Sequence, residues 1–193
     1  KKAQPVLMEG LRRLEYRGYD SAGIATMERD VIRITKAVGK VSELESRVQE
    51  DQSNVGIAHT RWATHGKPTE ANAHPHQSND GKVVVVHNGI IENYRELRTM
   101  LEREGHLFIS ETDTEVIAHL VRHELDGNLN LVDATRKALG QMRGTYGIIV
   151  MSSEYPDYIV AARMGSPLIL GVGDNEHYLA SDASAILRYT RQM

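Results

Sequence analysis

Arg61 and Asp113 are the two charged residues whose surroundings most clearly suggest binding chemistry. Arg61 stands among hydroxyl-bearing residues, and its planar guanidinium can grip a carboxylate through two parallel hydrogen bonds. Asp113 stands at the expected start of a helix, where backbone N–H groups and the helix dipole keep a carboxylate ionised and able to hold an ammonium group. Together they would clamp the two ends of a free α-amino acid. The alternative is that Arg61 is a surface cation and Asp113 an ordinary first-turn residue.

A run of four valines, Val83–Val86, predicts a strand that is buried on both faces. Asn88 and Gly89 are expected to end this strand in a sharp turn, because the pair tolerates positive φ. Free N–H groups at such a turn, beside an asparagine amide, are one way to build an oxyanion hole. The alternative is a plain junction of strand, turn and helix.

Five histidines between positions 59 and 87 raise the question of a metal site. Imidazoles are common zinc ligands, and His74 and His76 could share one face of an extended chain. However, no HExxH motif accompanies them, and the nearby carboxylates lack ligand spacing. The sequence therefore favours hydrogen-bonding loop histidines over a metal centre. Gly171 and Gly173 follow a strand but precede no helix, so no nucleotide-binding motif and no cofactor are expected.

The elements that would position these residues are predicted from hydrophobic periodicity. Helices are expected over 6–14, 42–49, 94–104, 115–125 and 131–142, and strands over 23–27, 31–36, 54–59, 83–87, 106–110, 146–151, 158–162, 168–172 and 177–180. Ser42, Asn93 and Thr112 each precede a glutamate by three residues, which predicts a capping box at each helix start. Strand pairs, a block of helices and further strand pairs indicate one α+β domain with stacked sheets covered by helices.

The composition excludes several classes of function. With 193 residues and 40% hydrophobic content, the chain can form one domain with a real core. A net charge of -3 gives no strong field to attract nucleic acid or an anionic membrane. No membrane-spanning run and no secretory signal are found, so a cytoplasmic location is expected. The absence of cysteine excludes disulfides and zinc–thiolate sites, and also any cysteine nucleophile within this chain.

Four stretches together carry a family resemblance: LEYRGYDSAG (14–23), HTRWATHG (59–66), VHNGIIEN (86–93) and ETDTEV (111–116). They resemble the glutaminase domain, a type 2 glutamine amidotransferase domain, of glutamine–fructose-6-phosphate aminotransferase (isomerizing), also called glucosamine-6-phosphate synthase. The resemblance covers essentially the whole chain, in the same order. Relatives such as amidophosphoribosyltransferase resemble the sequence at 20–23 and 88–89.

This resemblance implies a fold and an activity. The fold is the four-layer α/β/β/α sandwich of N-terminal-nucleophile hydrolases, with two mostly antiparallel sheets between helix layers. The activity is hydrolysis of L-glutamine to glutamate and ammonia through a cysteine thioester. In the whole enzyme, a C-terminal isomerase domain uses that ammonia to make glucosamine 6-phosphate from fructose 6-phosphate. A homodimer built through that domain is also implied.

Matching by motif implies a glutamine site. Arg61 would bind the α-carboxylate, with Thr64 and His65 beside it, and Asp113 would bind the α-amino group. Trp62 would belong to a mobile loop that closes over glutamine.

The same matching implies the catalytic residues. Asn88 and the Gly89 N–H would form the oxyanion hole, Arg17 would order the segment around the nucleophile, and His74 would lie near the pocket. The family's nucleophile is an N-terminal cysteine whose own amine acts as the base. Because residues 1–193 contain no cysteine, we expect a domain that lacks its first strand with the nucleophile, its C-terminal end and the isomerase domain. This polypeptide is therefore predicted not to hydrolyse glutamine. The alternatives are a glutamine-binding module without catalysis and another class 2 amidotransferase.

Overall fold

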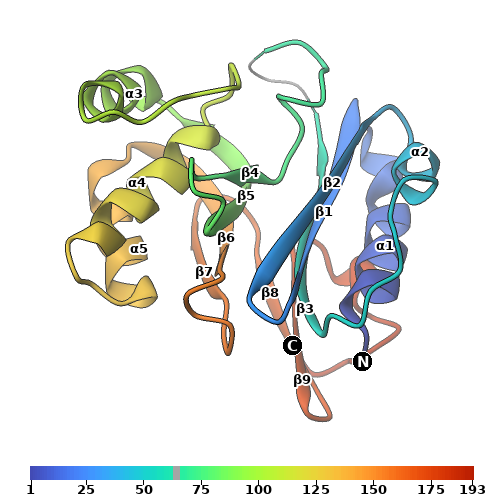
Figure 1. Cartoon of the computed structure of the whole chain (residues 1–193). Coiled ribbons are helices and arrows are strands. Elements are labelled where there is room, and N and C mark those ends of the chain that lie inside the picture. Colours follow the sequence, from blue (N-terminus) through green and yellow to red (C-terminus); the bar gives the residue numbers. More distant parts are fainter. Residues whose placement is uncertain (63–65) are drawn as a thin grey trace.

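Most helices and strands occur where hydrophobic periodicity predicts them, in a computed structural model that describes residues 1–62 and 66–193 (Figure 1). The helices are α1 (Ala3–Leu14), α2 (Val41–Glu45), α3 (Tyr94–Arg103), α4 (Glu115–Asp126) and α5 (Leu131–Gln141), with 3-10 turns η1 (Glu15–Arg17) and η2 (Ala183–Ala185). The strands are β1 (Ser21–Glu28), β2 (Val31–Val38), β3 (Val55–Arg61), β4 (His76–Gln77), β5 (Val83–Ile91), β6 (Gly144–Ser152), β7 (Val160–Met164), β8 (Ile169–Gly173) and β9 (Glu176–Ala180). Among the described helices, none is long and apolar enough to cross a membrane.

The strands form three antiparallel sheets, which confirms the predicted α+β class. The first sheet has the order β2-β1-β3, the second β4-β5-β6-β7, and β8 and β9 form a separate hairpin. The β1–β2 hairpin turns at Arg29 and Asp30, which both have positive φ. Such a two-residue turn matches the natural twist of paired strands.

Strand β5 is buried on both faces, as the valine run predicts. Val83 and Val85 pack into a core with residues of α3, α4 and α5, whereas Val84 and Val86 pack against Ala25 and Ile57 of the first sheet. Helices therefore cover one face of the second sheet, and the first sheet covers the other (Figure 1).

Helices α1 and α2 pack on the face of the first sheet that points away from β5 (Figure 1). Met8 and Leu11 of α1 and Leu44 of α2 contact Ala22 and Ile24 of β1 in a separate cluster. Full burial of each large side chain contributes about 1.5–3 kcal/mol, so this cluster holds both helices on the sheet.

The turn predicted at Asn88 and Gly89 is wrong. Strand β5 continues to Ile91 and pairs with β6 throughout, with Gly89 opposite Tyr146. Gly89 has φ 141°, and a Cβ atom there would lie 2.1 Å from the carbonyl oxygen of Thr145. Glycine is therefore required for a close approach between two strands rather than for a chain reversal.

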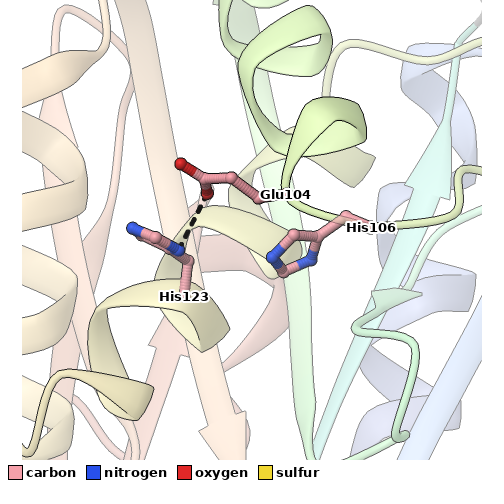
Figure 2. A group of neighbouring side chains, drawn as sticks. All are labelled: Glu104, His106 and His123. Carbon is pink, nitrogen blue, oxygen red and sulfur yellow. Dashed lines mark ion pairs between the residues drawn. The ribbon is translucent and has the colours of Figure 1, made fainter.

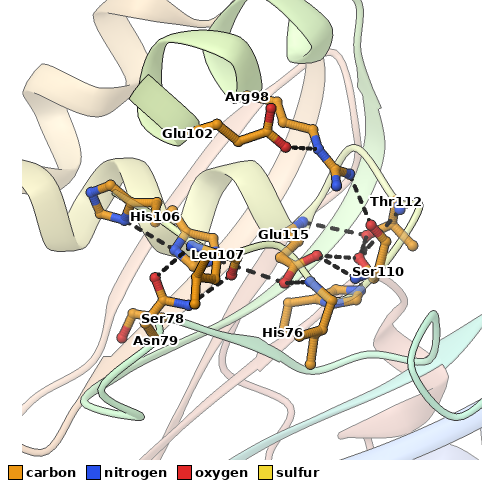
Figure 3. A network of polar contacts seen from close by, with 12 residues as sticks. His76, Ser78, Asn79, Arg98, Glu102, His106, Leu107, Ser110, Thr112 and Glu115 are labelled. Carbon is orange, nitrogen blue, oxygen red and sulfur yellow. Dashed lines mark hydrogen bonds and ion pairs between the residues drawn. The ribbon is translucent and has the colours of Figure 1, made fainter. Parts of the chain in front are cut away.

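The strand predicted over 106–110 is also wrong, because side chains take the place of a neighbouring strand (Figure 3). The Asn79 amide accepts a hydrogen bond from the Leu107 N–H and donates one to the Leu107 carbonyl. The buried Glu115 carboxylate accepts hydrogen bonds from the N–H groups of Ile109 and Ser110. These side chains thus satisfy several backbone groups of the segment without a ladder.

The three predicted capping boxes are not formed as expected. Ser42 lies inside α2, and the Asn93 side chain accepts a hydrogen bond from the Arg143 N–H across the fold instead of capping α3. Thr112 accepts a long hydrogen bond of 3.4 Å from the Glu115 N–H, but α4 begins only at Glu115. Only at Asn93 does a contact distant in sequence replace the local one.

Candidate active site

A cavity of about 910 Å³ collects most of the residues that the sequence assigns to a glutamine site. Strands β3, β5 and β6, helix α1 and the β8–β9 hairpin all contribute to its walls. Seven predicted residues line it: Arg17, Arg61, Trp62, His74, Asn88, Gly89 and Asp113. Thr64 and His65 lie outside the described residues.

Arg61 is the last residue of β3 and is buried, with 4% of its surface exposed, so it is not a surface cation. Its guanidinium donates to the backbone carbonyls of Gly66 at 3.3 Å and Lys67 at 3.5 Å. One of its nitrogens lies 3.5 Å from the Asp20 carboxylate. A buried guanidinium held in this way presents a fixed positive charge at the cavity.

Asp113 is equally buried, at 4% exposure, and lies two residues before α4. Its carboxylate accepts a hydrogen bond of 2.8 Å from the Ile91 N–H at the end of β5. This bond attaches the segment before α4 to the second sheet. Asp113 thus places a negative charge at the same cavity that holds the positive charge of Arg61.

Asn72 connects the two charged segments, and the sequence reasoning missed it. Its amide donates to the Lys67 carbonyl at 2.9 Å and to the Glu111 carboxylate at 3.1 Å, and its oxygen accepts from the Glu111 N–H at 2.9 Å. Lys67 belongs to the loop that holds Arg61, and Glu111 lies two residues before Asp113. An asparagine in a polar loop has no sequence pattern that reveals this role. The structure reveals it, because Asn72 is buried, with 2% of its surface exposed.

Asn88 and Gly89 lie side by side on β5, opposite Gly147 and Tyr146 of β6. The Ile91 N–H donates to Asp113 and therefore points away from β6. Because alternate N–H groups of a strand point to the same edge, the Gly89 N–H faces the edge on which Asp113 lies.

Four histidine side chains lie beside these residues: His74, His76 and His87 are buried, and His59 is half-buried. The rings of His59 and His74 lie 4.4 Å apart between centroids and are tilted by 31°, and the ring centroids of His74 and His76 lie 4.9 Å apart. Burial lowers the pKa of His59 to about 3 and that of His76 to about 3, and holds the pKa of His74 well below its usual range. Burial also lowers the pKa of His87, against the attraction of Asp113. All four are therefore neutral at pH 7.

The expectation of hydrogen-bonding loop histidines holds for only part of this group. His76 Nε2 lies 3.0 Å from the Thr112 hydroxyl (Figure 3), and His87 Nδ1 lies 2.9 Å from the Thr114 hydroxyl. The Nδ1 atoms of His59 and His74, in contrast, have no hydrogen-bond partner within residues 1–62 and 66–193. The two rings instead contact each other, which residue type alone could not indicate.

Trp62 and Arg17 lie at the cavity's outer wall. Trp62 is 67% exposed, and its ring covers Gly18, where a Cβ atom would lie 2.0 Å from the indole. The Arg17 guanidinium donates to the Ser181 hydroxyl at 2.9 Å, which connects η1 to the segment after β9. Gly18 has φ 81°, so glycine there serves both the turn and the tryptophan contact.

This fold is shared with glutamine amidotransferases of known structure. Glutamine phosphoribosylpyrophosphate amidotransferase from B. subtilis, solved with ADP and GMP, matches with a TM-score of 0.84 and 26% identity over 98% of this chain and 42% of that chain. A predicted glutamine amidotransferase from Pseudomonas aeruginosa PA01 shares the fold, with a TM-score of 0.51 and 17% identity over 83% of this chain and 70% of that chain. Fold and cavity thus define an amidotransferase-like domain.

The chain belongs to the glutamine amidotransferase domain family, whose model matches residues 59–188. It is similar to glutamine–fructose-6-phosphate aminotransferase (isomerizing) from Caldanaerobacter subterraneus subsp. tengcongensis, with 52% identity over 100% of this chain and 32% of the relative. The corresponding protein from Methanothermobacter thermautotrophicus is 54% identical over 99% of this chain and 32% of its own length. The chain spans about a third of the length of these curated relatives.

Proposed function

We propose that this chain is the glutamine-binding part of a glutamine–fructose-6-phosphate aminotransferase and presents L-glutamine for release of ammonia. The main observation in support is that Arg61 and Asp113, each 4% exposed, line one cavity and that Asn72 connects the segments on which they lie. Arg61 binds the α-carboxylate of glutamine and displaces part of its contact with Asp20. Asp113 binds the α-ammonium group. Trp62, Thr64 and His65 complete the substrate site.

The side-chain amide of glutamine then lies at β5. Asn88 and the Gly89 N–H stabilise the negative oxygen that forms when a nucleophile attacks the amide carbon, because donors fixed in a paired strand need no rearrangement. The direction of the Gly89 N–H, inferred from the Ile91–Asp113 hydrogen bond, supports this role. Arg17 and His74 support the wall around the reacting group.

The nucleophile is a thiol that residues 1–193 do not contain. In the proposed reaction, the thiolate attacks the amide carbon, ammonia leaves with one added proton, and water then hydrolyses the thioester to glutamate. The thiol belongs on a strand that pairs with β3, since β3 pairs with β1 alone among the described strands and its residues line the cavity. That strand would complete the four-layer α/β/β/α sandwich of N-terminal-nucleophile hydrolases.

The remainder of the whole protein follows from the same proposal. An isomerase domain that binds fructose 6-phosphate receives the ammonia and forms glucosamine 6-phosphate, and a homodimer forms through that domain. The similarity to relatives three times as long as this chain supports the presence of further domains. A second candidate function is a glutamine-binding module without catalysis, which the absence of cysteine favours.

Glutamine binding to the 193-residue chain tests the site itself. Arg61→Met and Asp113→Asn should each weaken binding by roughly 10- to 150-fold in isothermal titration, because each removes a hydrogen-bonded charge pair of about 1.5–3 kcal/mol. Asp30→Asn, at an exposed turn outside the cavity, is the matched control and should bind as the parent does. Equal affinity in all four proteins would refute the proposed site.

Ammonia release tests the reaction. The protein extended by the residues that precede Lys1 in its encoded form should release ammonia from glutamine, and its Cys→Ala variant should not. Release by the 193-residue chain alone would refute the thiol mechanism. No release by a folded, extended protein that binds glutamine would favour the binding module.

A further inference from the structure

We propose that Glu104, His106 and His123 form a binding site for a divalent transition-metal ion of the Zn²⁺ type (Figure 2). Each side chain offers one ligand atom, and these atoms lie within 4.8 Å of one another, a grouping found once among the described residues. The three residues come from the segment after α3 and from α4. None of them lines the cavity at which Arg61 and Asp113 lie.

The spacing of the ligand atoms is close to what a tetrahedral ion requires. Zn²⁺ binds imidazole nitrogen and carboxylate oxygen at about 2.0–2.1 Å, which puts neighbouring ligand atoms roughly 3.4 Å apart. The Glu104 carboxylate oxygen and His123 Nδ1 are already 3.1 Å apart. The remaining separations of up to 4.8 Å close by side-chain rotation, because the side chains of Glu104 and His123 are 43% and 39% exposed. That exposure also leaves room for a water molecule as fourth ligand.

The donor set selects the class of ion. Two imidazoles and one carboxylate suit Zn²⁺, Ni²⁺ or Cu²⁺, whereas Mg²⁺ and Ca²⁺ prefer oxygen ligands. Metal-binding imidazoles usually hydrogen-bond through their second nitrogen. His119, at 1% exposure, provides this partner, because its Nδ1 lies 3.2 Å from His106 Nδ1.

Without an ion, the Glu104–His123 contact is an ordinary surface ion pair worth little stability. With an ion bound, α4 is cross-linked to the end of α3 and to the first residue of the 106–112 segment. That segment leads directly to Asp113 and is held by the side chains of Asn79 and Glu115. A bound ion therefore stabilises the chain just before the proposed ammonium-binding carboxylate.

The test is thermal unfolding and isothermal titration of the full chain with Zn²⁺ alone. Titration should show one ion per chain, and Zn²⁺ at about 100 times its dissociation constant should raise Tm by roughly 5–10 °C. Mg²⁺ and Ca²⁺ should not change Tm. Glu104→Gln and His123→Gln should each lose most of the Zn²⁺-dependent shift, and both should fold, because these side chains are partly exposed.

His177→Gln is the matched control, since His177 is an exposed histidine outside the group. It should keep the full shift and the same stoichiometry. The proposal is overturned if the parent chain shows no Zn²⁺-dependent shift. It is equally overturned if Glu104→Gln and His123→Gln bind as the parent does, because binding would then lie with other histidines, such as those beside the cavity.

Discussion

Replacing Gly89 with alanine should destabilise the fold, because the substitution adds a Cβ atom where β5 and β6 approach each other closely. The new Cβ atom would lie 2.1 Å from the Thr145 carbonyl oxygen, and side-chain Cβ atoms essentially never approach another atom closer than 3.0 Å. The two strands must therefore separate by at least 0.9 Å, the difference between these distances. The φ of 141° adds backbone strain for any residue with a side chain.

The magnitude follows from these two effects. Backbone strain at such a φ costs about 1–3 kcal/mol, and loss of one or two strand hydrogen bonds costs about 0.5–1.5 kcal/mol each. Together they predict a loss of about 1.5–6 kcal/mol, a large part of the stability of an ordinary domain. The urea midpoint should fall by roughly 1–2 M.

Urea unfolding followed by circular dichroism measures the effect, with Gly140→Ala as the control for adding one methyl group. A Cβ atom at Gly140, in α5, meets nothing within 4 Å, so this variant should be unchanged or more stable by up to about 1 kcal/mol. The close-approach argument would be refuted if the Gly89→Ala and Gly140→Ala variants unfolded at the same urea concentration.

Three further predictions concern buried polar groups. Asn72→Ala should cost about 2–4 kcal/mol in urea unfolding and weaken glutamine binding, because the Lys67 and Glu111 backbone groups lose their partner; unchanged affinity would contradict its positioning role. Stability should fall as pH drops from about 6.5 towards 3, by about 1.4 kcal/mol per pH unit for each of His59 and His76, whose pKa burial lowers to about 3, since the unfolded chain takes up protons that the folded one excludes; His59→Gln should reduce this slope. Glu115→Gln should destabilise the chain at pH 7, and its difference from the parent should shrink as pH falls from about 4.5 to about 2, because hydrogen bonds to the carboxylate lower its pKa to about 2.

The sequence predicts those parts of the fold that depend on local pattern. The Val83–Val86 strand and the amphipathic α4 are identified from residue type and period alone. In each element, the apolar residues that form the pattern are the ones that are buried. Asn88 and Gly89, in contrast, have the composition of a turn but the conformation of a paired strand. Pairing with β6, more than fifty residues away, overrides the local preference, and a sequence pattern cannot represent that contact.

The candidate site divides in the same way. Arg61 and Asp113 could be singled out because they stand in recognisable motifs and have opposite charges; the structure shows that both line one cavity, and their roles toward glutamine stay predictions. Asn72 could not, since its importance comes from partners at Lys67 and Glu111 that the loop brings together. The contact between the rings of His59 and His74 could not be predicted either, because a histidine whose Nδ1 atom lacks a hydrogen bond has no signature in residue type.

The alternation of valines along β5 has a consequence for how the chain unfolds. Val83 and Val85 belong to the core under the helices, and Val84 and Val86 belong to the core between the sheets. Displacing β5 would therefore remove packing from both cores at once. The strand that carries Asn88 and Gly89 therefore connects the two cores, and a perturbation that displaces this strand should weaken the packing of both and the proposed site together.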